Sequence, residues 1–140
     1  MKNKVKVMMA TILVLLLIVP VFAGDGSSII FGRSCVLLPG PRLCYPVNDE
    51  VVLTGKDFLE FRWWNDCMRI DHFIFKIYKG YTMYGSDLVH KQNLPAHISS
   101  LKIKSELFQD GQVYTWSLQQ VSLDGQKSDK SFNSFKVIKN

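Results

Sequence analysis

The sequence has few of the residues and motifs that mark metalloproteins and nucleotide-dependent enzymes. Three cysteines and three histidines are present among 140 residues, and none has the CxxC or HxxxH spacing of a metal site. No glycine-rich phosphate loop of the Walker or dinucleotide-binding type occurs. No segment repeats apolar residues with the 3.6-residue period of an amphipathic helix. We therefore expect no metal site, no cofactor and no helical bundle, and the length favours a single domain.

The long apolar run is confined to the N-terminus. Three lysines (Lys2, Lys4 and Lys6) precede an apolar stretch over residues 7–19, which Pro20 ends, and Val21 and Ala23 follow at the positions that a signal peptidase reads. This order predicts a helical signal peptide over residues 1–23. An uncleaved anchor is the alternative, but the apolar core is shorter than the roughly 20 residues that cross a bilayer. We expect a secreted or periplasmic protein that meets the membrane only through this segment before cleavage.

The positive charge of the chain comes largely from that segment. The whole sequence has a net charge of +5, with 17 basic and 12 acidic side chains. Residues 24–140 keep 14 basic and all 12 acidic side chains, a net charge of +2. These charges are scattered along the chain rather than clustered, so we do not expect nucleic acid as a partner.

The cysteines predict one disulfide. Cys35 and Cys44 flank a Pro-Gly-Pro turn signal at residues 39–41, and secreted proteins enter an oxidising compartment. We predict a Cys35–Cys44 pair, although three cysteines also allow the two pairs that include Cys67. Under the favoured pairing Cys67 is left over, either buried as a small apolar residue or able to link two chains into a dimer.

Beyond a 24–48 extension that holds two cysteines, the apolar residues alternate with polar ones. This period of two is typical of half-buried strands, and Asp124-Gly125 is a hairpin turn signal. The expected strands contain Val51 and Leu53; Leu59, Phe61 and Trp63; Phe73, Phe75 and Ile77; residues 88–90; Ile98, Leu101 and Ile103; Tyr114, Trp116 and Leu118; and Phe135 and Val137. Residues 49–140 are thus predicted to form an all-β, seven-stranded antiparallel sandwich.

Three stretches of this domain resemble a fibronectin type III or related immunoglobulin-like domain of secreted bacterial proteins. They are Leu59-x-Phe61-x-Trp63, Phe73-x-Phe75-x-Ile77 and the segment 107–118, LFQDGQVYTWSL. The resemblance implies a core position for Trp63 and a corner in which the Tyr114 hydroxyl bonds to nearby backbone. Gln109 and Asp110 stand where the family usually has a proline, and the spacing fits if Phe108 takes the family's leucine position. No Arg-Gly-Asp is present, so that binding mode is not carried over.

No set of nucleophile, base and orienting group is visible in the sequence. Cys67 with His72 lacks an orienting group, and Asp66 with Asp71 offers too few oxygen ligands for calcium. Exposed aromatic and methionine side chains are better candidates, because such residues are enriched at protein contacts. The candidates are Trp64, Tyr81, Met83 and Tyr84, and Ile74 and Tyr78 are expected on the outward face of their strand. Alternatively, these side chains cover one another or pack under residues 24–48.

These features predict a non-catalytic, secreted or envelope-associated module that mediates protein contacts or has a structural role. A carbohydrate-binding module would use the same aromatic side chains to hold a glycan. A small hydrolase is the third interpretation, and it lacks a visible catalytic set. Assembly through Cys67 or through an unpaired sheet edge is a further alternative.

Overall fold

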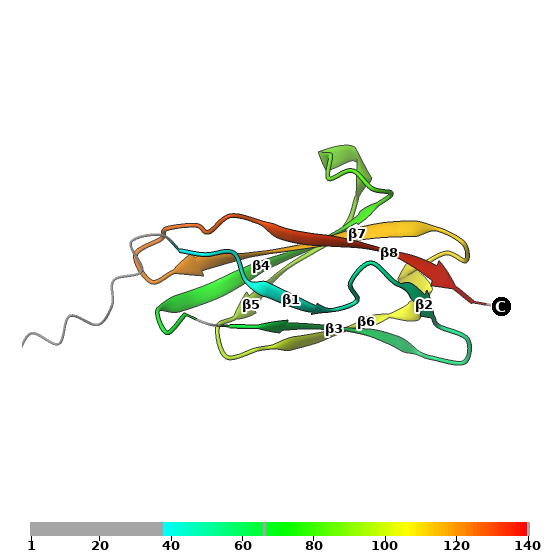
Figure 1. The fold of residues 1–140 in the computed structure, drawn as a ribbon, viewed down its shortest axis with the longest axis horizontal. Coiled ribbons are helices and arrows are strands. Elements are labelled where there is room, and N and C mark those ends of the chain that lie inside the picture. The colour runs from blue at the N-terminus through cyan, green and yellow to red at the C-terminus, as the bar shows by residue number, and fades with distance from the viewer. Residues whose placement is uncertain (1–37, 66, 140) are drawn as a thin grey trace, which may run out of the picture. The chain divides into compact units, whose positions relative to one another are not determined.

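The computed structural model describes residues 38–65 and 67–139. The predicted signal peptide, Cys35 and Asp66 lie outside these residues. In the described ranges, no helix is long and apolar enough to cross a membrane. The chain forms two sheets, which Figure 1 shows as two layers. The strands are β1 (Arg42–Tyr45), β2 (Glu50–Val52), β3 (Phe58–Trp64), β4 (Ile70–Lys79), β5 (Leu88–Pro95), β6 (Ser100–Lys104), β7 (Val113–Ser122) and β8 (Ser131–Ile138), with short 3-10 turns at Gly85–Asp87 and Ser105–Leu107.

The smaller sheet has the order β1-β3-β6 and the larger one the order β2-β8-β7-β4-β5. The core lies between them and is built from the alternating residues that the sequence indicated. Phe61, Phe75 and Trp116 are fully buried, and the Phe61 ring meets the other two edge-on, with centroids 5.0 and 5.1 Å apart. Such edge-to-face contacts add to the free energy gained by burial. The all-β, two-sheet prediction is confirmed.

The structure has eight strands in the described residues, and the predicted number of seven is wrong. The extra strand, β1, lies within residues 24–48, the predicted extension. It pairs with β3 in antiparallel register, Arg42 opposite Trp64 and Leu43 opposite Trp63. The strand is only four residues long and follows a Pro-Gly-Pro segment, so periodicity alone gave little signal for it. One pair also departs from the antiparallel prediction, because β2 runs parallel to β8.

Tyr78 is a second correction, because we expected it on the outward face and it is only 4% exposed. The β4–β5 register shifts between Ile77 and Tyr78, and such an irregularity re-aims the side chains that follow it. Ile74, which was expected on the same face, is half-buried.

The corner that the resemblance implied is present. The Gln109 backbone N–H donates to the Tyr114 hydroxyl oxygen over 3.0 Å. Phe108 is 1% exposed and its ring meets Tyr114 edge-on at 5.1 Å, whereas Leu107 is only partly buried. Phe108 therefore occupies the position of the family's leucine, which accounts for the extra residue in the spacing.

The Asp124-Gly125 turn is also confirmed. Gly125 has a φ of +83°, and its backbone N–H donates to the Ser122 carbonyl over 2.9 Å. The Ser122 hydroxyl donates to the Asp124 carboxylate. This hydrogen bond holds the pKa of Asp124 below its ordinary value of 3.8, because it stabilises the ionised form.

Candidate binding face

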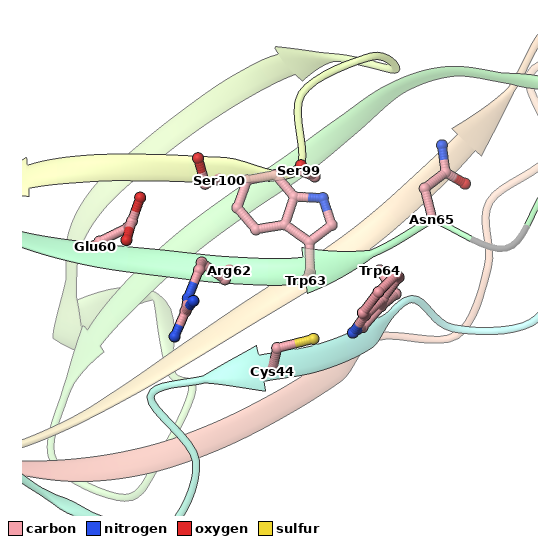
Figure 2. A pocket seen from close by; sticks show the side chains of 8 residues that line it. All are labelled: Cys44, Glu60, Arg62, Trp63, Trp64, Asn65, Ser99 and Ser100. Atoms are coloured by element: carbon pink, nitrogen blue, oxygen red, sulfur yellow. The ribbon is translucent and has the colours of Figure 1, made fainter.

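The two tryptophans at the end of β3 have opposite surroundings. Trp63 is 3% exposed and packs against Phe73, with ring centroids 5.9 Å apart. Trp64 is 62% exposed. Figure 2 shows the two side chains leaving opposite sides of the strand, as its pleat requires. The structure thus confirms that Trp63 lies in the core and that Trp64 points outward.

Trp64 borders a pocket of about 660 Å³ on the smaller sheet. In Figure 2 the side chains of Arg62 and Trp64 lie on the same side of β3 and flank Cys44 of β1. The lining residues thus include two tryptophans, an arginine, a glutamate, a cysteine, an asparagine and two serines. They are Cys44, Glu60, Arg62, Trp63, Trp64, Asn65, Ser99 and Ser100.

The polar groups of the pocket are unequally satisfied. Asn65 is held in place, since its side-chain amide donates to the Ala96 carbonyl over 3.2 Å and its oxygen accepts the Cys67 N–H over 3.1 Å. The Trp63 Nε1 is buried and finds no acceptor among the described residues. Buried donors in folded proteins normally have a partner, and Trp63 is an exception on the core side of β3.

The other three predicted contact residues lie elsewhere, in the loop between β4 and β5. Tyr81 is 76% and Tyr84 69% exposed, and Met83 is half-buried. Tyr81 borders a different pocket, of about 360 Å³, beside Glu50 and Lys136. Strand β4 begins after the short connection that follows Trp64, and its ten residues span about 30 Å. The structure therefore separates Trp64 from the loop residues; Figure 1 shows this loop at the top of the view.

Two arginines flank Trp64, a grouping that no local pattern in the sequence indicates. Register places Arg42 directly beside Trp64, and Arg62 lies two residues before it on the same face of β3. The Arg62 guanidinium carbon lies 5.6 Å from the centre of the Tyr45 ring, a cation–π distance. Arg42 and Arg62 come from strands 20 residues apart in the sequence, so only strand pairing brings them together.

Comparisons with known proteins identify the fold. No protein-family model matches the sequence, and no curated protein matches it. A computationally redesigned β-sandwich protein is similar in structure, with a TM-score of 0.56 and 15% identity over 74% of this chain and 98% of that one. An α-L-rhamnosidase from Dictyoglumus thermophilum has a TM-score of 0.50 and 14% identity over 72% of this chain and 12% of that one. Fibronectin(III)-like modules of Clostridium thermocellum CbhA have a TM-score of 0.45 and 16% identity over 71% of this chain and 95% of the module.

The two-sheet order, the tyrosine corner and the similarity to the redesigned β-sandwich protein agree. The chain folds as a fibronectin type III-like, immunoglobulin-like β-sandwich. Within this fibronectin type III-like sandwich, the Trp64 pocket lies on the outer face of the smaller sheet, because Glu60, Arg62 and Trp64 of its lining alternate with buried residues along β3.

The cysteine and histidine candidates of the sandwich do not assemble into a catalytic group. Cys67 is buried, 7% exposed, and the His72 Nδ1 lies 2.7 Å from the carboxylate of its neighbour Asp71 on an accessible surface. In residues 38–65 and 67–139, no three His, Cys, Asp or Glu side chains come together as metal ligands would. Cys44 is exposed, but Cys35 lies outside the described residues, so the Cys35–Cys44 disulfide stays a prediction.

Proposed function

We propose that this protein is a non-catalytic module that, after export, holds a partner at the cell envelope through the Trp64 pocket. The observation that carries the proposal is a 62% exposed indole at the rim of a 660 Å³ pocket on the outer face of a sheet. An exposed, rigid aromatic side chain beside a hollow is the usual anchor of a recognition surface. The N-terminal pattern of lysines and apolar residues supports export to the periplasm or the exterior.

Two classes of partner fit an exposed tryptophan. The first is another protein of the envelope, because aromatic side chains are enriched in protein interfaces. The second is a glycan, and the lining favours it: Asn65, Ser99 and Ser100 add an amide and two hydroxyls to the same pocket. A sugar ring presents an apolar face to an aromatic ring and hydroxyl groups to such donors and acceptors. For a hydrolase, residues 38–65 and 67–139 offer no assembled catalytic group as support.

The proposal is tested by co-sedimentation of the processed protein with the cell-envelope fraction of its own source. We expect Trp64→Ala to weaken binding about tenfold or more, because truncating an aromatic anchor commonly costs that much. Phe132→Ala is the matched control, since Phe132 is 59% exposed on β8 of the other sheet, and we expect it to bind as the unmodified protein does.

The same assay separates the two groups of aromatic side chains. If Tyr81→Ala or Tyr84→Ala abolishes binding while Trp64→Ala does not, the contact surface is the β4–β5 loop and our assignment to the Trp64 pocket is wrong. Envelope binding that is unchanged in Trp64→Ala overturns the assignment as well. Circular dichroism of each variant shows whether the sandwich is intact.

A further inference from the structure

The outer face of the smaller sheet carries an excess of positive charge. The alternation of exposed and buried positions places basic side chains outward on all three strands, against Glu60 as the acidic one. Arg42, Arg62, Lys102 and Lys104 are these cations. Because residues 24–140 carry a net charge of only +2, the concentration of four cations on one face is a property of the fold.

The charge is greatest near Trp64. Arg42 is opposite Trp64, Arg62 is opposite Ser100, and Lys102 is opposite Glu60. Lys104, at the other end of β6, shares a separate hollow with Asp57 and Glu106, which offset its charge. Lys102 is likewise offset by Glu60, so the unbalanced cations are Arg42 and Arg62, beside the indole.

These cations form no salt bridge within the described part of the chain. The salt bridges between described residues join His72 to Asp71 and Lys136 to Glu50, and none involves Arg42, Arg62 or Lys102. The Tyr45 ring beneath Arg62 supports its guanidinium from one side while the fork of donors remains available. An arginine fork matches the two oxygens of a carboxylate or phosphate better than a lysine does.

The surroundings of Trp64 also argue against a large apolar interface. Its neighbours on the face are charged, hydroxyl or thiol side chains, whereas the buried centre of a protein interface is depleted in charge. A flat apolar ring, hydroxyl and amide groups, and flanking arginines together fit a sugar unit that bears an acidic group. We infer that the ligand of the Trp64 pocket is an acidic polysaccharide, with carboxylate or phosphate groups that pair with Arg62 and Arg42. This inference rests on the proposed function and specifies its ligand.

The test is isothermal titration calorimetry of the protein, without its signal segment, with a set of polymers. These differ in the acidic group, in its charge or in the presence of sugar rings. The probes are alginate, whose acid is a carboxylate; uncharged, fully esterified alginate; and phosphorylated mannan, whose acid is a phosphate. Polyglutamate and polyphosphate carry charge without sugar rings. We expect at least one acidic polysaccharide to bind. Esterification of alginate should weaken its binding about tenfold, and so should raising the salt concentration.

Four variants show whether the pocket is responsible. Arg62→Gln and Trp64→Ala should each weaken binding of the acidic polysaccharide about tenfold. Lys91→Gln removes an exposed charge from β5, and Phe132→Ala removes an exposed ring from β8; both should bind as the unmodified protein does. The probe that binds more tightly, alginate or phosphorylated mannan, identifies the acidic group.

Three outcomes would overturn the inference. The first is that alginate binds and its uncharged ester binds equally tightly. The second is that polyglutamate or polyphosphate binds as tightly as either polysaccharide, with no loss in Trp64→Ala. The third is that no acidic polysaccharide binds while Trp64→Ala still loses envelope binding. In that case the proposed function holds, and the partner belongs to another chemical class. If Trp64→Ala loses neither envelope binding nor polysaccharide binding, the proposed function itself is contradicted.

Discussion

At the scale of single residues, the Tyr114 hydroxyl contributes a hydrogen bond in addition to the burial of its ring. It accepts the Gln109 N–H at 3.0 Å, and this fixes the chain where it enters β7. We predict that Tyr114→Phe lowers the free energy of unfolding by about 1–2 kcal/mol, the usual cost of a lost hydrogen bond that leaves a donor without its partner. Urea unfolding followed by tryptophan fluorescence measures the change.

The control for this prediction is Tyr84→Phe. Tyr84 is 69% exposed, so removing its hydroxyl should alter stability by less than about 0.5 kcal/mol. Equal effects of the two substitutions would mean that the Tyr114 hydrogen bond contributes no more than a surface hydroxyl.

Residue types alone predicted the position of Trp64 but not its charged neighbours. A period of two along β3 is visible in the sequence, so an inward Trp63 implies an outward Trp64. Arg42 becomes its neighbour only through the register of β1 with β3. Strand register depends on pairing between distant segments, and no local pattern in a single sequence specifies it.

At the scale of elements, the β7–β8 turn depends on one glycine. Gly125 has a φ of +83°, and a side chain added there would meet no atom within 4 Å. The expected cost of Gly125→Ala is therefore conformational and not steric, about 1–2 kcal/mol for a left-handed backbone. Gly85→Ala is the matched control, because Gly85 also has open space around it but does not have a positive φ.

Thermal unfolding of the two alanine variants tests this prediction. We expect Gly125→Ala to lower the melting temperature by several degrees and Gly85→Ala to leave it nearly unchanged. A melting temperature that is the same in both variants would show that the turn relaxes to another conformation at little cost.

The elements that were predicted well are those with long alternation. Strands β3, β4 and β7 each bury a run of large side chains on one face, and this produces a clear period of two. Strand β5 was predicted only over residues 88–90, although it continues to Pro95. Most of its residues are exposed because it lies at the edge of its sheet, so burial imposes little alternation on it.

At the scale of the whole molecule, the sandwich begins earlier than its sequence pattern does. Pro46 lies outside the predicted 49–140 domain, yet its carbonyl accepts the Nε1–H of Trp116, a fully buried side chain, over 2.8 Å. The side chain of Gln120 likewise donates to the Pro39 carbonyl. These bonds join β7 of the larger sheet to the segment around β1, so residues 39–46 contribute to the stability of the core.

This contribution can be measured by comparing two shortened proteins, one beginning at residue 38 and the other at residue 49. The second lacks β1 and leaves the Trp116 donor buried without its acceptor, which alone costs about 1–3 kcal/mol. Removing β1 also exposes the side of β3 that β1 covers next to Trp63, and this adds to the loss of stability. We therefore expect the protein beginning at residue 49 to be less stable by about 3 kcal/mol or more, or unfolded. Urea unfolding of both proteins provides the comparison, and neither contains Cys35, so a disulfide with Cys44 cannot influence it. Equal midpoints and slopes would show that β1 rests on the sandwich without stabilising it, and would restore residue 49 as the start of the folding unit.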